Sequence, residues 1–77
     1  MDKARKQQFD NVIYSLMEAK NELVEIQKDE IADFDMLPVC FQLSSRGDNM
    51  QEWISFIDKT VIEIYNVIGK IQERIKS

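Results

Sequence analysis

Apolar residues recur every three or four positions along the second half of the chain. From Met50 to Ile75 they step 4-3-4-3-4-3-4, and no polar residue interrupts the series. This is the spacing of the a and d positions of a coiled coil, which form one apolar seam along a helix. We therefore predict a helix over about residues 48–76 that buries this seam against other helices. The seam comprises Met50, Ile54, Ile57, Val61, Ile64, Ile68, Ile71 and Ile75.

The first half of the chain predicts another helix, over about residues 3–34, because this segment lacks glycine and proline and is rich in helix formers. Two apolar lines run along it. One steps by three and four residues through Phe9, Val12, Leu16, Ala19, Leu23 and Ile26. The other repeats every seven residues through Met17, Val24 and Ile31. Together they cover roughly half of the helix circumference, so we expect this helix to contact more than one neighbour.

Residues 35–47 break both patterns and predict a linker. Pro38 lacks a backbone donor and disfavours the helical conformation at Leu37. Asp48 is expected to be the N-cap of the second helix, with Gln51 completing a capping box. The predicted fold is all-α, a single domain over residues 1–77 that forms an antiparallel two-helix hairpin.

A lone hairpin of this kind leaves both wide apolar faces half exposed. We expect two copies to cover them by pairing as a homodimeric four-helix bundle. In an alternative arrangement, the faces meet the helices of other chains, and the protein is a structural subunit of a helical hetero-assembly. A chain of 77 residues usually needs a disulfide, a metal or oligomerisation to be stable. One cysteine excludes an internal disulfide, and the absence of histidine excludes the usual zinc sites. Oligomerisation is the aid to stability that remains.

Charge and composition limit the class of protein and its cellular location. The net charge of −4 argues against a general nucleic-acid binder, which would present a clustered basic face. No apolar run approaches the ~20 residues of a membrane span, and no apolar segment of a secretory signal follows the basic N-terminus. A single free thiol suits a reducing compartment. We expect a cytoplasmic protein that does not bind membranes.

Acidic residues of the first helix offer one candidate metal site. The pairs Glu22-x-x-Glu25 and Glu30-x-x-Asp33 form a pattern similar to the magnesium motif of all-α nucleotide pyrophosphohydrolases of the MazG-like type. In those enzymes the two pairs lie on different helices and converge on the metal ions. Here four residues separate the pairs on one helix, so they cannot converge, and we expect a solvated acidic face.

The inventory of catalytic groups is small. Cys40 has no histidine to activate it as a nucleophile, and its neighbours Val39 and Phe41 favour a small buried hydrophobic residue. We therefore predict that the protein is not an enzyme and carries no cofactor or metal.

Aromatic residues gather near the predicted linker. Phe56 falls almost opposite the seam, where a polar residue is expected, and Trp53 lies three residues before it. Tryptophan and phenylalanine are typical anchors of protein interfaces. We predict a protein-binding surface made of Leu37, Phe41, Trp53 and Phe56, with a small local core under the linker as the alternative.

Basic residues are expected to gather at the opposite end, where an antiparallel hairpin brings both termini together. A helix N-terminus with added cations is an anion site in principle; a solvated terminus is the alternative. The residues concerned are Lys3, Arg5, Lys6, Lys70, Arg74 and Lys76.

The functional expectation is a non-catalytic protein–protein interaction module, a small dimeric helical regulator, inhibitor or adaptor of a larger protein. Its expected partners are a second copy of itself and an unidentified protein. The alternative is a small binder or sponge of anionic ligands such as nucleotides, which would use the basic end at an oligomer interface.

Overall fold

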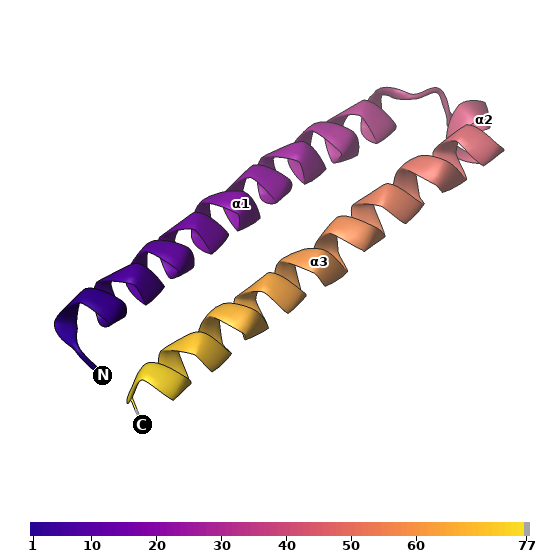
Figure 1. Cartoon of the computed structure of the whole chain (residues 1–77). Helices are drawn as coiled ribbons and strands as arrows, with labels where there is room; N and C mark the ends of the chain where they lie inside the picture. The colour runs from indigo at the N-terminus through magenta and orange to yellow at the C-terminus, as the bar shows by residue number, and fades with distance from the viewer. Residues whose placement is uncertain (77) are drawn as a thin grey trace.

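The computed structural model describes residues 1–76 as a helical hairpin (Figure 1). Helix α1 spans Lys3–Met36, the single-turn helix α2 spans Val39–Gln42, and helix α3 spans Ser45–Lys76. Figure 1 shows both termini at one end of the hairpin and α2 at the other. The prediction of an all-α chain with two long helices and a short connection is confirmed.

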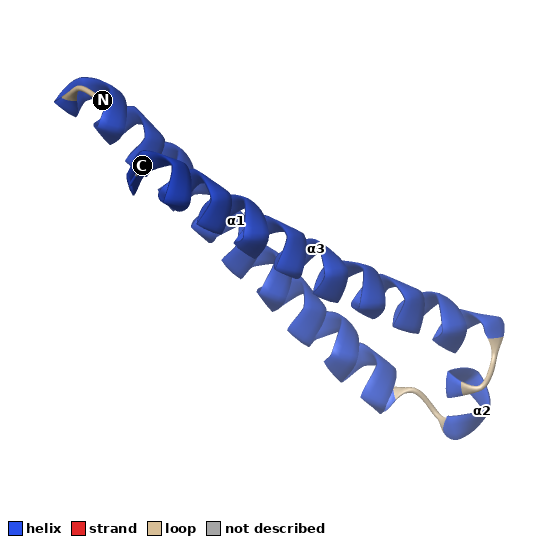
Figure 2. Ribbon diagram, turned by 90° about the horizontal axis from the view of Figure 1, so that it is seen from below, coloured by secondary structure: helices blue, strands red, loops and turns tan. Residues whose placement is uncertain are grey.

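The hairpin is long and thin. It measures 59 × 16 × 12 Å and has a radius of gyration of 17.5 Å, whereas a compact domain of this length would have one of about 11 Å. Figures 1 and 2 show α1 and α3 running beside each other along their length. Each long helix thus has only one long neighbour, and α3 is also contacted at its start by the short helix α2. None of the helices among the described residues is long and apolar enough to cross a membrane.

Side-chain and backbone geometry explains where α1 begins and ends. The carboxylate of Asp2 accepts a hydrogen bond of 2.8 Å from the backbone N–H of Arg5, which caps the helix. The helix ends at Met36 because Leu37, directly before Pro38, is extended with φ −70° and ψ 140°. It runs two residues beyond the predicted end at residue 34.

The connection differs from the predicted 13-residue linker, because α2 occupies its middle and α3 begins at Ser45. Asp48 is therefore not an N-cap. It lies in the first turn of α3, and its N–H donates to the Ser44 carbonyl over 3.0 Å. The side-chain amide of Gln42, within the segment expected to be a linker, donates to the backbone carbonyls of Phe34 and Leu37 over 3.0 and 3.1 Å. These bonds tie α2 to the end of α1.

The core follows the apolar seam of α3. All eight seam residues, from Met50 to Ile75, are buried or half-buried, and Ile57 and Ile68 are the most enclosed, at 4% and 5% exposure. On α1, Ile13 is buried. Along the rest of that helix, the half-buried residues are Leu16, Lys20, Leu23, Val24, Gln27, Glu30 and Phe34.

Helix α1 presents a different face to α3 than the apolar line suggested. Of the predicted line, Leu16 and Leu23 are half-buried, and the other four members are exposed: Phe9, Val12, Ala19 and Ile26. The helix is rotated so that Lys20 and Gln27 lie against α3. The Gln27 amide donates to the Ile54 carbonyl over 3.1 Å and to Asp58 Oδ1 over 2.6 Å. Lys20 Nζ lies 5.5 Å from the centre of the Tyr65 ring. Polar contacts thus accompany this rotation, which leaves an apolar flank uncovered.

Candidate functional site

The end of the hairpin that carries α2 presents an exposed aromatic pair. Trp53 and Phe56 lie one turn apart on α3, with ring centres 5.6 Å apart and planes at 86°. This edge-to-face arrangement is a favourable aromatic contact. Both side chains are nonetheless more than half exposed, at 53% and 54%. We call Leu37, Phe41, Trp53 and Phe56 the loop-end surface.

Two hollows adjoin Trp53. One, of about 300 Å³, is lined by Trp53, Phe56, Asn49 and Glu52. The other, of about 570 Å³, lies between the end of α1 and the start of α3 and brings Leu37 together with Trp53. Its remaining lining residues are Glu30, Asp33, Met36, Arg46, Asn49 and Met50. An aromatic centre with a charged rim is the usual composition of a protein-binding patch.

The structure joins three of the four predicted residues of this surface. Leu37 shares a hollow with Trp53, and Trp53 shares another with Phe56. Phe41 lies on α2, about half exposed, and lines neither hollow. Leu37 and Phe34 are half-buried where α1 ends, and no apolar side chain near them is fully buried among the described residues.

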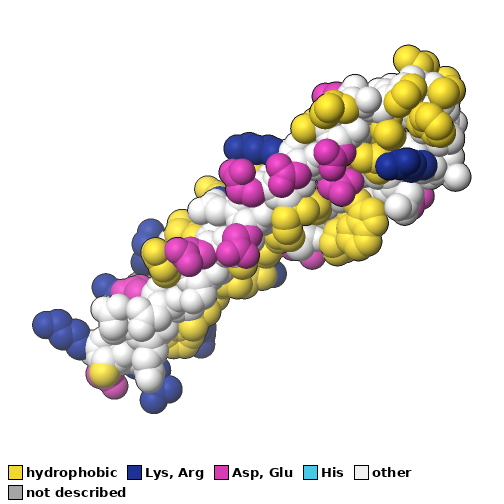
Figure 3. Space-filling view, turned by 90° about the horizontal axis from the view of Figure 1, so that it is seen from above, with side chains coloured by type: hydrophobic (Ala, Val, Ile, Leu, Met, Phe, Trp, Pro, Cys, Tyr) yellow, Lys and Arg dark blue, Asp and Glu magenta, His cyan; other side chains and the backbone are white. Residues whose placement is uncertain are grey.

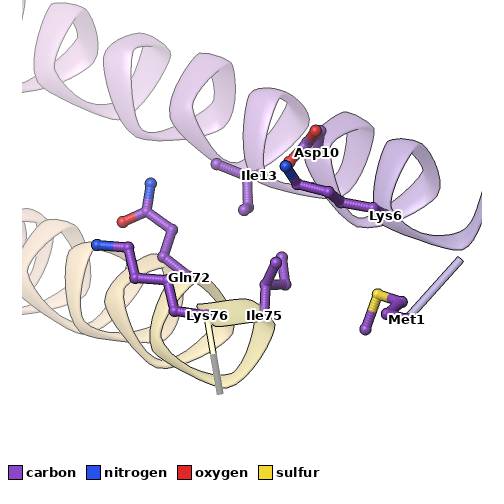
Figure 4. Close-up of a pocket in the computed structure, with 7 residues that line it drawn as sticks. All are labelled: Met1, Lys6, Asp10, Ile13, Gln72, Ile75 and Lys76. Carbon is purple, nitrogen blue, oxygen red and sulfur yellow. The ribbon is translucent and has the colours of Figure 1, made fainter. Parts of the chain in front are cut away.

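The other end of the hairpin carries six of the ten basic residues, and Figure 3 shows Lys and Arg side chains there as well as further along the molecule. All six predicted bases are exposed. Lys6 and Lys76 face a hollow of about 510 Å³, whose lining is completed by Met1, Asp10, Ile13, Gln72 and Ile75 (Figure 4). Lys70 and Arg74 line a second hollow of about 190 Å³ with Met1, Phe9, Ile71 and Ile75. Lys3 and Arg5 line neither of the two. The bases therefore surround the end of the hairpin rather than converging on one point, and Asp10 shares the larger hollow with two lysines.

The acidic residues of α1 are exposed, except Glu30, which is half-buried. Glu25 pairs with Lys28 at 3.4 Å, and both side chains are well exposed. Within residues 1–76, no three cysteine or carboxylate side chains gather closely enough to hold a metal ion. Cys40 is a free thiol and is exposed. The expectation that Cys40 is buried is therefore wrong: α2 is a single turn, and its Val39, Cys40 and Phe41 are all exposed.

One surface was not recognised as separate from the hairpin core in the sequence. Val12, Ala19 and Ile26 are exposed along one side of α1, at intervals of seven residues. Arg5 and Asp33 continue the same spacing at its two ends, and both are exposed. We call these five residues the α1 flank. Lys20 and Gln27 are the polar residues of the face that packs against α3. They are the sequence signal that distinguishes this packed face from the exposed flank.

No protein-family model matches the chain, and no curated protein or solved structure matches it.

Proposed function

We propose that this protein is a non-catalytic protein–protein interaction module, a small dimeric helical regulator, inhibitor or adaptor that binds a larger protein in the cytoplasm. The observation that carries this proposal is the Trp53–Phe56 pair, which is exposed on α3 beside two hollows. Large aromatic side chains held in this way are the residues that dominate binding energy in protein interfaces.

The packing of α3 explains why this pair suits binding. Ile57 directly follows Phe56 and is 4% exposed, so the two side chains leave the helix on different sides. The seam therefore anchors the helix while Phe56 projects outward. A partner that covers Phe56 would gain apolar burial without unpacking the hairpin. Glu52, Asp33 and Arg46 around the hollows supply charges that would select among partners.

The proposal that the protein is a dimer rests on the small number of buried apolar side chains. Three apolar side chains are buried among the described residues: Ile13, Ile57 and Ile68. Many large apolar side chains are more than 40% exposed, Val12, Ile26, Ile62 and Val67 among them. A small chain with this little core is usually completed by association. The absence of histidine from the sequence also favours a binding role over acid–base catalysis.

A capture experiment with matched variants tests the partner-binding surface. Tagged wild-type protein, Phe56→Ala and Trp53→Ala are used to capture proteins from lysate of the source cell, with quantification by mass spectrometry. Ile62→Ala is the control, because Ile62 is a similarly exposed residue of α3, at 61%. A protein retained by wild type and Ile62→Ala but lost with Phe56→Ala supports the proposal. Equal retention by all variants contradicts it.

A second candidate function is suggested by the hollow at the terminal end. Lys6 and Lys76 line it together with Gln72, Asp10, Ile13 and Ile75. Two ammonium groups and an amide beside apolar side chains suit a phosphorylated ligand such as a nucleotide. Calorimetric titration with cyclic and linear nucleotides tests this. Binding heat that is present with wild type and absent with Lys6→Gln supports nucleotide binding. No heat with wild type contradicts nucleotide binding.

A further inference from the structure

The α1 flank is symmetric about Ala19 in its apolar residues and carries opposite charges at its two ends. Arg5, Val12, Ala19, Ile26 and Asp33 are a base, an apolar residue, a small residue, an apolar residue and an acid. Seven-residue spacing keeps all five on one side of the helix. Val12, Ala19, Ile26 and Asp33 directly precede the residues Ile13, Lys20, Gln27 and Phe34, which are buried or half-buried against α3. The flank therefore borders the hairpin seam along almost the whole of α1.

This order makes the flank complementary to an antiparallel copy of itself. A twofold axis at Ala19 places Val12 against Ile26 of the partner subunit, and Arg5 against Asp33 of the partner subunit. Every contact away from the axis then occurs twice, as it must in an isologous interface. Alanine at the axis lets the two helices approach closely, because its side chain is a single methyl group.

Helix α3 carries a second column that fits the same axis. Trp53, Thr60, Val67 and Arg74 follow one another at seven-residue intervals beside the α3 seam. Trp53 shares a hollow with Asp33 of the α1 flank, so this column borders the same side of the hairpin as the flank. Cross-helix contacts put Ala19 level with about residue 64 of α3. The middle of the α3 column lies between Thr60 and Val67, at that level. The axis therefore pairs Val67 with the partner's Thr60.

Charge distinguishes between the two ways in which the hairpins can stack. With the loops at opposite ends, the basic terminal end of each copy meets the acidic loop-end half of α1, which contains Asp29, Glu30 and Asp33. With the loops at the same end, the basic ends of α1 and α3 meet each other and repel. The antiparallel arrangement is the one that charge complementarity favours.

The opposite side of the hairpin is a poorer interface. Its column on α1 is Asp10, Met17, Val24 and Ile31, and a twofold axis through the middle of it places Asp10 against the partner's Ile31. Burying a carboxylate against an aliphatic side chain is costly. This side also holds the polar contacts of Lys20 with Tyr65 and of Gln27 with Asp58.

We infer that the α1 flank is the homodimer interface, with a twofold axis at Ala19 and the two loop ends at opposite ends of a four-helix bundle. The inference rests on the dimer included in the proposed function and does not depend on which protein Phe56 binds. Trp53 borders the partner's Arg74 in this bundle, so Phe56 is the outward anchor of each loop-end surface. The bundle presents that surface twice, once at each end.

Disulfide trapping tests the position of the axis. Ala19→Cys and Glu18→Cys are each made in the Cys40→Ser background and oxidised mildly at equal concentration. Two residues at a twofold contact lie within disulfide reach, whereas Glu18 points away from the flank. We expect a covalent dimer with Ala19→Cys at least tenfold faster than with Glu18→Cys. Equal rates, or faster trapping at residue 18, overturn the inference.

Charge reversal tests the antiparallel register without a disulfide. Arg5→Glu and Asp33→Arg each create two like-charge contacts, and each should weaken the dimer about fivefold to thirtyfold by sedimentation. The double variant restores opposite charges and should return to within about threefold of wild type. Additive weakening in the double variant overturns the inference. If wild type sediments as a dimer in that case, the proposed dimer stands and another face forms it; a wild-type monomer contradicts both.

Discussion

Gly47 of α3 lies so close to the backbone of Gln42 in α2 that a Cβ at residue 47 would come within 2.8 Å of the Gln42 Cα. No side chain fits in that space, because the atoms it would meet belong to the backbone and cannot move aside alone. The contact matters because the Gln42 amide holds the carbonyls of Phe34 and Leu37 at the end of α1. Gly47 thus allows α2 to join the two long helices.

Substitution of the two glycines should have opposite effects. Gly47→Ala forces α2 away from α3 and should lower the free energy of unfolding by about 1–3 kcal/mol. Gly69 is the matched control, because a Cβ there meets nothing within 4 Å. Gly69→Ala should raise the free energy of unfolding by about 0.5–1 kcal/mol through helix propensity. Urea denaturation followed by circular dichroism measures both. A Gly47→Ala variant as stable as wild type would refute the close packing.

Two adjacent residues of α3 should separate stability from binding. Ile57 is 4% exposed, so Ile57→Ala should lower the free energy of unfolding by about 2–5 kcal/mol. Phe56 is 54% exposed, so Phe56→Ala should change it by less than about 1 kcal/mol. Thermal unfolding compares the two variants. A loss with Phe56→Ala as large as with Ile57→Ala would show that Phe56 belongs to the core.

The polar contact between the long helices is also measurable. Gln27→Ala removes hydrogen bonds to Asp58 and to the Ile54 carbonyl, and should cost about 1–2 kcal/mol of stability. Asp58→Ala should cost less, because Gln27 keeps the carbonyl bond. A double-mutant cycle should give a coupling of about 0.5–1 kcal/mol. Additivity of the two substitutions would mean that Gln27 and Asp58 do not interact in solution.

Exposed isoleucines on different sides of the hairpin should differ in their effect on association. Ile26 is 51% exposed on the α1 flank, and Ile62 is 61% exposed on α3 away from it. Ile26→Ser removes two apolar contacts per dimer and should weaken association by about 2 kcal/mol, or about thirtyfold. Ile62→Ser should leave it unchanged. The concentration dependence of thermal unfolding reports both. Equal weakening by the two variants would place the interface elsewhere.

The fold of α3 could be predicted from the sequence because a single signal determined it. Its apolar residues form one uninterrupted seam, and that seam is what packs against α1. Phe56 was recognised as an outward residue for the same reason, since it falls opposite a well-defined line.

The orientation of α1 could not be predicted in the same way. Its apolar residues lie on two sides of the helix. The sequence shows that both sides are apolar but does not show which of them packs against α3. The outcome depends on Lys20 and Gln27, whose contacts with Tyr65, Ile54 and Asp58 are tertiary. The most regular apolar line of α1 therefore remains exposed along Val12, Ala19 and Ile26.

The connection was mispredicted because its decisive bonds join residues that local rules do not relate. Asp48 has the chemistry of an N-cap, yet α3 begins earlier, at Ser45. The Gln42 amide reaches eight residues back to Phe34, and the glycine that makes room for α2 lies in α3.

The natural cysteine permits the most direct test of the antiparallel bundle. Cys40 is free, exposed and close to the tip of the loop end, so one spin label can be attached there without a substitution. Pulsed dipolar spectroscopy then measures the separation of the two loop ends. We predict roughly 50–60 Å, because the helical rise of about 1.5 Å per residue from Ala19 to the loop is traversed twice. A separation under about 30 Å, which loops at the same end would give, or no dipolar coupling at all, would contradict the account.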